Sequence, residues 1–284
     1  MPEGDTIWRA ARALQAALGG RTLTAFKSSL PSVAAAARRF GLVGRPVSGV
    51  EAKGKHLLVR FGSGAVLHTH QGMTGSWHLY RRGSRWRQPA HLARVVLETD
   101  EVVAVCFRAP LVELLPAAAA ARHAALTRLG PDVMAEAFDA AEARARLRAA
   151  GDVEIGAALL DQSRLAGVGN VYKSEVLFLC GLNPFARVGG LADETLDRVI
   201  ATARRQMRSV LHALSHSRER SGIHSREASG GSGGCAAAPP SLKTPKHWVY
   251  RRAGQRCLRC GTKIQRRMQG NPPRSTYFCP ACEA

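Results

Sequence analysis

The amino-acid sequence contains no apolar run close to the roughly 18 residues that a membrane-spanning helix needs. It also lacks a recognisable signal peptide, because Glu3 and Asp5 place negative charge at the amino end, where a secretory signal is positively charged. No repeat of about 20 to 50 residues recurs along the chain, which argues against a solenoid or propeller. We therefore expect a soluble, cytoplasmic protein without a membrane partner.

Acidic residues are also scarce. The 284 residues include 21 Asp and Glu against 41 Lys and Arg, which gives a formal net charge of +20 and a pI near 10.9. Such an excess of positive charge predicts a polyanionic partner, with nucleic acid as the first candidate and a membrane surface as the second. The length suggests two domains, or one domain with a small module, and is ample for a buried core.

Seven cysteines are present, an odd number, and four of them gather near the carboxyl end. Cys257 and Cys260 form one C-x₂-C pair, and Cys279 and Cys282 form another after an interval of 18 residues. This spacing predicts one tetrahedral Zn²⁺ ion per chain in a closed, structural site, with a redox pair as the alternative. The arrangement fits a reducing compartment better than a disulfide framework, and Cys235 is expected to be a free thiol.

The amino end has a pattern with chemical meaning. If Met1 is removed, the chain begins with the secondary amine of Pro2, next to the carboxylate of Glu3. An α-amino group has a pKa of about 7.7 to 8.0, so its neutral form can attack an aldehyde-like carbon and give an iminium ion. Apolar residues then recur at helical spacing until Gly19, and the positive end of that helix would support an ionised Glu3. The alternative is a frayed terminus without a chemical role.

Residues 22–115 have the sequence pattern of a β-domain, in which short apolar runs are separated by Gly, Ser, Pro and Asp. This pattern is typical of an all-β sandwich or barrel. The expected strands cover residues 23–26, 47–50, 56–61, 65–70, 77–80, 93–98 and 102–107.

Two loops of this β-region have candidate binding residues. Lys53 and Lys55 flank a glycine just before a strand, which makes a compact positive charge of phosphate size; a solvated hairpin is the alternative. His70 ends another run and is followed by a Gly-punctuated turn that contains Met73. An exposed Met73 could act as a wedge in a stack of bases, whereas a core-facing methionine is the alternative.

The second half of the chain is helical in pattern, and Gly130-Pro131 marks the boundary. Helices are expected over residues 155–162 and 170–180, with Asn170 as the cap of the second and Gly181 as its stop. The glycines Gly167 and Gly169 between these helices would let backbone N–H groups converge on a phosphate, or they form a tight corner without a ligand. A further helix is expected over residues 191–214, and residues 221–240 read as a Gly/Ala/Pro-rich linker.

Taken together, these motifs resemble the formamidopyrimidine-DNA glycosylase / endonuclease VIII family, in order and essentially end to end. They are Pro2-Glu3-Gly4, Gly54-Lys55-His56-Leu57-Leu58, Leu165 to Asn170 followed by Tyr172 and Glu175, and a Cys₄ hairpin with Arg274 five residues before Cys279. Met1-Pro2-Glu3-Gly4 is similar to the endonuclease VIII branch. The resemblance implies an α+β fold: a catalytic β-sandwich with an amino-terminal helix (residues 1–120), a helical domain with a helix–two-turn–helix motif (121–218), a flexible loop (219–245) and a zinc-finger β-hairpin (246–284).

The resemblance also implies roles for individual residues. Pro2 would attack C1′ of a damaged nucleotide flipped out of the duplex, with Glu3 as general acid and base, and the iminium would lead to β- and then δ-elimination. Met73 would fill the gap left by the extruded base. Phosphates near the lesion would be held by Lys55, His70, Asn170 and Arg274, together with the backbone at Gly167 and Gly169. The partner would be damaged double-stranded DNA, bound by a monomer in a bacterial-type cytoplasm, at the nucleoid.

Several positions depart from the family pattern. Asp5-Thr6 replaces the common Pro-Glu, Gly72-Met73-Thr74 lacks the Gln-Leu-Tyr of endonuclease VIII, and Arg108-Ala109-Pro110 lacks the Arg and Phe of the formamidopyrimidine branch. Three functions therefore stay open. The first is a bifunctional glycosylase and AP lyase acting on oxidised bases, most of all pyrimidines. The second is an AP lyase with weak or different base excision, and the third is a non-catalytic zinc protein that binds DNA.

Overall fold

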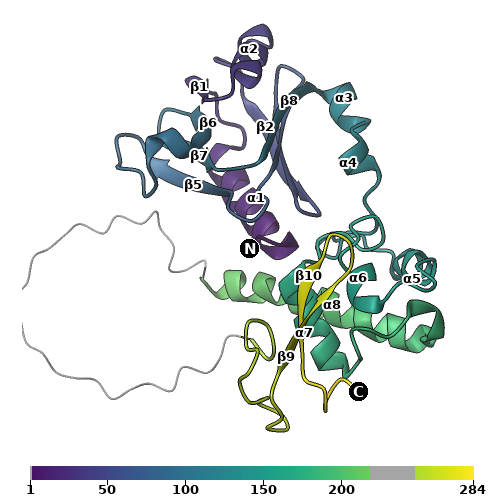
Figure 1. Ribbon diagram of the computed structural model, residues 1–284. Coiled ribbons are helices and arrows are strands. Elements are labelled where there is room, and N and C mark those ends of the chain that lie inside the picture. Colours follow the sequence, from purple (N-terminus) through teal and green to yellow (C-terminus); the bar gives the residue numbers. More distant parts are fainter. Residues whose placement is uncertain (1, 218–246) are drawn as a thin grey trace, which may run out of the picture.

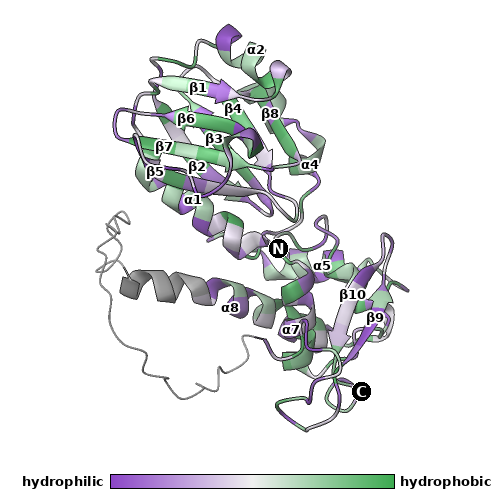
Figure 2. Ribbon diagram, turned by 60° about the vertical axis from the view of Figure 1, so that its left-hand side comes forward, coloured by the Kyte–Doolittle hydropathy of each residue, from purple (hydrophilic) through white to green (hydrophobic). Residues whose placement is uncertain are grey.

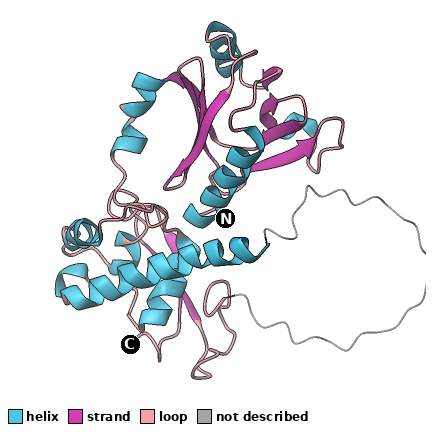
Figure 3. Cartoon of the chain, turned by 180° about the vertical axis from the view of Figure 1, so that it is seen from behind, coloured by secondary structure: helices cyan, strands magenta, loops and turns pink. Residues whose placement is uncertain are grey.

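The computed structural model describes residues 2–217 and 247–284, and it has two halves, a β-sandwich and a mainly helical part (Figure 1). Seen from behind, one half contains the two sheets with helices around them, and the other half consists mainly of helices with a hairpin beside them (Figure 3). The α+β class is confirmed. The loop predicted over residues 219–245, with Cys235, lies outside the described residues. No helix within the described ranges is long and apolar enough to cross a membrane.

The sandwich consists of two antiparallel four-stranded sheets. One has the order β1 (Ala25–Ser28), β6 (Ala93–Glu98), β7 (Val102–Phe107) and β5 (Ser76–Arg81), and the other β2 (Val47–Lys53), β3 (His56–Phe61), β4 (Ala65–His70) and β8 (Leu111–Pro116). Inward side chains of both sheets share one core, with Leu57 and Leu67 on one side and Val95 and Leu97 on the other. Figure 2 shows the hydrophobic residues gathered along these strands.

All seven predicted strands are present, but two elements of this half were missed. Strand β8 follows Pro110 and ends at Pro116, and its sequence does not alternate cleanly because helices α2 (Pro31–Arg39) and α3 (Ala117–Ala121) also contact it, so that Leu115 is apolar on the face away from the core. Helix α2 begins at a proline, which is favourable at the first helical position, and buries Val33 and Ala37 one turn apart.

Helix α1 (Gly4–Leu18) packs against the second sheet through Ile7, Ala11, Leu14 and Leu18, as predicted. The start of this helix has an unusual cap. Glu3 is the N-cap residue, and its side chain makes no capping bond to α1 because it is bound by another helix.

Two short helices, α3 and α4 (Ala124–Thr127), cover the outer face of the second sheet, and a 3-10 turn at Ala90–Leu92 precedes β6. The helical half contains α5 (Ala140–Arg148), α6 (Ile155–Ala158), α7 (Asn170–Cys180) and α8 (Asp193–Ser217), with a 3-10 turn at Val188–Gly190. Helix α7 ends at Gly181, whose φ of 62° is left-handed, as the stop signal predicts. Asn170 was expected to cap α7, but Gly169 occupies the cap position and Asn170 is the first helical residue. The Asn170 side chain is thereby free to reach the hairpin.

The carboxyl-terminal hairpin pairs β9 (Gln265–Gln269) with β10 (Arg274–Phe278) in an antiparallel register. It packs on α7: Phe178 of the helix shares a small core with Val249, Ile264 and Cys279. Lys173 of α7 is fully buried, and its Nζ donates to Thr276 Oγ1 of β10 at 2.7 Å. Helix α7 therefore fixes the position of the hairpin.

Candidate active site

A cleft of about 620 Å³ lies between the two halves, and it collects nearly all of the residues predicted to act. Pro2, Glu3, Lys55, His70 and Met73 line it from the sandwich, and Gly169, Asn170 and Arg274 line it from the opposite half. Among the residues predicted to act on DNA, Gly167 is the one that does not line the cleft. The remaining lining residues are Gly72, Thr74, Leu160, Tyr250, Arg251, Met268, Pro273, Ser275 and Tyr277.

Glu3 is the most constrained residue of the cleft, with 2% of its surface exposed. Its Oε1 accepts a hydrogen bond from the Val171 N–H at 2.8 Å, and its Oε2 accepts from the N–H groups of Gly169 at 3.1 Å and Tyr172 at 3.2 Å. These are unpaired donors at the positive end of α7, which favours a carboxylate. Burial nevertheless raises the pKa of Glu3, while the Val171 N–H and the Lys55 charge oppose that rise. The site can therefore hold Glu3 as an anion and still accept a proton there.

The two glycines of the turn make hydrogen bonds within the protein. The Gly169 N–H donates to Glu3, and the Gly167 N–H donates to Gln162 Oε1 at 3.0 Å. The Gly167 carbonyl accepts from the N–H of Gly4 at 2.9 Å. Both N–H groups already have acceptors within the protein, so in this structure they are not free to bind phosphate; their role in DNA binding stays a prediction. The turn holds the acid and the start of α1.

Asn170 points from α7 toward the hairpin. Its Nδ2 donates to the Ser275 carbonyl at 2.8 Å, and its Oδ1 is buried without a hydrogen-bond partner among the described residues. An unsatisfied buried amide oxygen is costly, so it needs a donor that arrives with a ligand or water.

Lys55 and Lys53 diverge at the turn between β2 and β3. Gly54 has a φ of 57°, and its N–H donates to Asp132 Oδ2 at 2.7 Å, which attaches this turn to the helical half. Lys55 lines the cleft, whereas Lys53 is exposed and does not. Burial lowers the pKa of Lys55 to about 8, and the positive charge of Arg274 contributes, while Glu3 opposes. Of the two lysines predicted to bind phosphate, only Lys55 lines the cleft. Its lowered pKa means that it loses its proton more readily than an ordinary lysine.

His70 enters the cleft at the end of β4 with a defined tautomer. The Gly72 N–H donates to its Nδ1 at 3.2 Å, so a neutral ring has its proton on Nε2. Burial, followed by the charge of Lys55, lowers the pKa of His70 and favours that neutral form. His70 can therefore donate one N–H bond without adding a charge.

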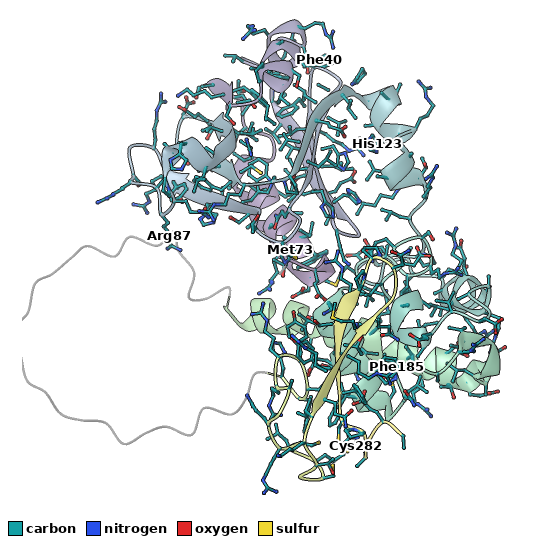
Figure 4. The ribbon with its side chains drawn as sticks, viewed as in Figure 1. Phe40, Met73, Arg87, His123, Phe185 and Cys282 are labelled. Carbon is teal, nitrogen blue, oxygen red and sulfur yellow. The ribbon has the colours of Figure 1, made fainter. Side chains whose placement is uncertain are left out.

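Met73 is 65% exposed, so the alternative of a core-facing methionine is wrong. In Figure 4 it lies on the underside of the sandwich, facing the other half. Met268 of β9, 58% exposed, lines the same cleft from the hairpin side. Met268, Tyr250 and Arg251 were not among the residues that the sequence motifs predicted for the site. The run of aromatic and basic residues at 248–252 is the signal that could have found the last two.

The four carboxyl-terminal cysteines come together as predicted. Their sulfur atoms all lie within 4.8 Å of one another, with Cys257 to Cys282 at 3.9 Å and Cys260 to Cys279 at 3.4 Å. All four are free thiols, and a tetrahedral ion with bonds of about 2.3 Å to sulfur would separate its ligands by about 3.8 Å. The cluster fits a single metal ion. The Cys279 N–H donates to Glu283 at 2.7 Å, which steadies this loop.

Comparisons with known proteins agree with this geometry. Residues 1–110 match the formamidopyrimidine-DNA glycosylase N-terminal domain, and residues 129–220 match the H2TH domain of the same enzyme. The chain belongs to the formamidopyrimidine-DNA glycosylase / endonuclease VIII family. The resemblance noted in the sequence is thereby confirmed.

Relatives place the chain in the endonuclease VIII-like branch of this family. It is 40% identical to a probable endonuclease 8 2 of Streptomyces coelicolor, over all of this chain and 94% of that protein. It is 36% identical to a DNA-(apurinic or apyrimidinic site) lyase Nei2 of Mycolicibacterium smegmatis, over 100% of this chain and 99% of that one. Among solved structures, a Lactococcus lactis formamidopyrimidine-DNA glycosylase bound to DNA with an AP site has a TM-score of 0.76 at 20% identity, and 99% of each chain is covered. The last likeness supports the fold of this family member.

Proposed function

We propose that the protein is a base-excision DNA glycosylase with AP lyase activity that acts on damaged double-stranded DNA. The observation that carries the proposal is the Glu3 carboxylate, which three amides of α7 hold beside Pro2 at one side of a cleft lined by Lys55 and Arg274. The names of the relatives support the enzyme class, and a non-catalytic DNA-binding protein has no need of this pair.

The chemistry follows from the two residues. Once Met1 is removed, the lone pair of the Pro2 nitrogen attacks C1′ of the damaged nucleotide, a C–N bond forms, and the glycosidic bond breaks with its electron pair leaving on the base. Glu3 acts as general acid and base at the sugar, a role that fits a carboxylate whose pKa burial has raised. Glu3 then passes the proton from the Pro2 nitrogen to O4′, the C1′–O4′ bond breaks, and the nitrogen lone pair forms the C=N bond of a cationic iminium, which acidifies the C2′ proton. Its loss expels the 3′ phosphate, and a second elimination expels the 5′ phosphate.

The remaining cleft residues would hold the strand. Lys55 and Arg274 supply positive charge from opposite halves, and His70 supplies an uncharged donor for a phosphate oxygen. Asn170 can add a donor only through the second hydrogen of Nδ2, since the first is bonded to the Ser275 carbonyl. Met73, exposed and apolar, would fill the gap left by the flipped base.

For the four cysteines we propose one structural Zn²⁺ ion. Four thiolates at tetrahedral spacing suit zinc, and a site with four protein ligands has no open position for catalysis. When bound, the ion would cross-link the loop at Cys257 and Cys260 to the end of β10 and so hold the hairpin that presents Arg274.

The test is covalent trapping. With abasic-site DNA and borohydride, the mature protein should form a reduced covalent complex, because reduction of the iminium fixes the Pro2–C1′ bond. Pro2→Gly should lose most of this product. His91→Ala, an exposed histidine outside the cleft, should trap as the unaltered protein does. Unchanged trapping by Pro2→Gly would refute the nucleophile, and binding without any nicking by the unaltered protein would indicate a non-catalytic DNA-binding protein.

A lyase with weak or different base excision is the second candidate, favoured by the replacements at Met73 and Ala109 and by the relative named as a lyase. Oxidised pyrimidines are the substrates we propose for the first candidate. Nicking of duplexes that contain thymine glycol, dihydrouracil, 8-oxoguanine, uracil or an abasic site separates the two. A lyase without base excision nicks only the duplex with the abasic site, whereas the glycosylase also nicks the duplexes with oxidised pyrimidines.

A further inference from the structure

A row of histidines lies on the outer face of the sheet that contains β3, β4 and β8. His68 and His70 are two residues apart on β4, and His56 is paired with His70, so these three side chains share a face. Glu113 of β8 is directly opposite His68. His123, in the turn between α3 and α4, covers them from outside (Figure 4). The proposed reaction uses His70 alone, so the other four groups have no role in it.

Three of these groups converge on a single point. Glu113 Oε2 lies 3.1 Å from His68 Nδ1 and 3.1 Å from His123 Nε2, and one ligand atom from each residue falls within 4.8 Å of the others. Ligands about 2.0 to 2.2 Å from a tetrahedral zinc ion are separated by about 3.3 Å. The two separations of 3.1 Å from Glu113 Oε2 are therefore already close to the distance between two corners of such a tetrahedron.

We propose that His68, Glu113 and His123 form a second metal site, which binds Zn²⁺ or a similar first-row divalent cation. Two imidazole nitrogens and one carboxylate oxygen are a donor set that zinc accepts, with water in the fourth position. The side chains of Glu113 and His123 are 34% and 24% exposed, so an ion and its water can enter from solvent. The site is on the sandwich, away from the four cysteines of the hairpin.

The surroundings support metal binding. His68 is fully buried, and both of its ring nitrogens have a polar neighbour that fixes the position of the ring. His68 Nε2 lies 2.8 Å from His56 Nδ1. When His68 binds metal through Nδ1, its proton resides on Nε2 and has His56 as a ready acceptor, the outer hydrogen bond that metal-bound histidines use.

Metal binding would shift protons within the rings without releasing any. In the absence of metal, Glu113 accepts one N–H bond from each histidine, from His68 Nδ1 and from His123 Nε2. With metal on those nitrogens, both protons move to the opposite nitrogens of the rings. The His123 Nδ1 then gives up its contact with the Ala125 N–H, which is long, at 3.3 Å, and exposed. His56 takes its own proton on Nε2, in a ring whose centre lies 4.9 Å from that of His70.

The test uses the full chain with its cysteines loaded with one equivalent of zinc, and Co²⁺ as the probe. The unaltered protein should take up one further equivalent of Co²⁺, with visible absorption that lacks the intense sulfur-to-cobalt charge-transfer band of a thiolate site. Zinc should displace it. Glu113→Gln and His123→Ala should lose the further equivalent, whereas the exposed His91→Ala should keep it.

The unaltered protein alone can test whether the second metal site exists. If it binds no second equivalent, or binds one with thiolate charge transfer, the proposal is overturned. A second equivalent that survives in both folded variants would overturn it as well. As an independent readout, nitrogen NMR of the histidine rings should show His68 change from the Nδ1–H to the Nε2–H form on addition of Zn²⁺, and an unchanged spectrum would contradict the site. The measurement does not depend on the proposed DNA activity.

Discussion

At the scale of single residues, the cleft depends on a contact between amino acids 166 positions apart, Glu3 and Gly169. A side chain at 169 would occupy the place of the carboxylate, since an added Cβ would lie 2.3 Å from Glu3 Cδ. The backbone φ of −123° at Gly169 is open to any residue. The glycine is therefore required by the close approach of Glu3 and not by backbone conformation.

Gly169→Ala should accordingly lower the rate of base excision by about tenfold or more, since each factor of ten needs only about 1.4 kcal/mol of lost transition-state stabilisation. The fold should persist, because the strain is relieved by moving one side chain. Single-turnover nicking of damaged duplex measures the effect. Gly190→Ala is the matched control, as an added Cβ there meets no atom within 4 Å. Equal rates for the two variants would contradict the role of this contact.

Lys55 gives a prediction about protons. Because its pKa is about 8 in the free protein, roughly half of the molecules lack this charge at pH 8, and a DNA phosphate placed beside it raises the pKa again. Binding of abasic-site DNA at pH 8 should therefore take up about half a proton, and affinity should fall as the pH rises further. Calorimetry in buffers of different ionisation enthalpy measures the uptake.

Two variants test the assignment of that proton. Lys55→Met should abolish the uptake, whereas Lys53→Met, on the exposed side of the same turn, should retain it. Buffer-independent heats for the unaltered protein would show that Lys55 is already charged before DNA binds.

At the scale of elements, α7 connects the parts of the molecule. Its amino end binds Glu3, its middle binds β10 through Lys173, and the Glu175 carboxylate accepts the N–H groups of Trp248, Val249 and Tyr250. A buried carboxylate with three amide donors is well satisfied, so it orders the chain that leads into the hairpin. The hairpin that carries Arg274 is thus held by the same helix that binds the Glu3 carboxylate.

The hairpin has a second anchor in Gln269, which is 5% exposed. Its Nε2 donates to Glu154 and to the Pro184 carbonyl, both at 2.8 Å, and its Oε1 accepts from Thr276 at 2.7 Å. Gln269→Leu would leave these partners unsatisfied, so we expect a loss of about 1 to 3 kcal/mol in the free energy of unfolding. Denaturant unfolding of the metal-loaded protein measures it. The exposed Gln265→Leu on the same strand should cost little, and equal losses would show that Gln269 is not an anchor.

The sequence predicted elements well where one periodic pattern was sufficient. The short apolar runs of β3, β4, β6 and β7 were predicted with the correct bounds, and the cysteine spacing predicted the cluster at the hairpin. Contacts between segments that are distant in the sequence were harder to predict. Nothing local to Gly169 or to Gln269 shows that its partner is Glu3 or Glu154, so the turn amides were assigned to phosphate and the anchor was missed. Tyr250 and Arg251 reach the cleft only because Glu175 folds their segment onto α7.

At the scale of the whole molecule, charge should govern DNA affinity, since the net charge is +20. The logarithm of the binding constant should fall linearly with the logarithm of salt concentration, by about 0.9 per phosphate neutralised. Lys55→Ala and Arg274→Ala should each reduce that slope by about one. Lys27→Ala is the control, because Lys27 lies outside the cleft and pairs with Glu98 at 2.6 Å. Fluorescence anisotropy from low to high salt gives the slopes, and identical slopes in all three variants would remove Lys55 and Arg274 from the interface.

The contacts of Glu3 and Gly4 with the opposite half make the state of the Glu3 carboxylate depend on closure of the cleft. Glu3 leaves the sandwich and is held by the other half, and the adjacent Gly4 N–H is bound by the Gly167 carbonyl. Separation of the halves would return this carboxylate to water, where it has an ordinary acidity and no fixed direction. In the mechanism that we propose, the enzyme is therefore active only while its two halves are closed, because the contact that joins them is the one that holds Glu3 in place.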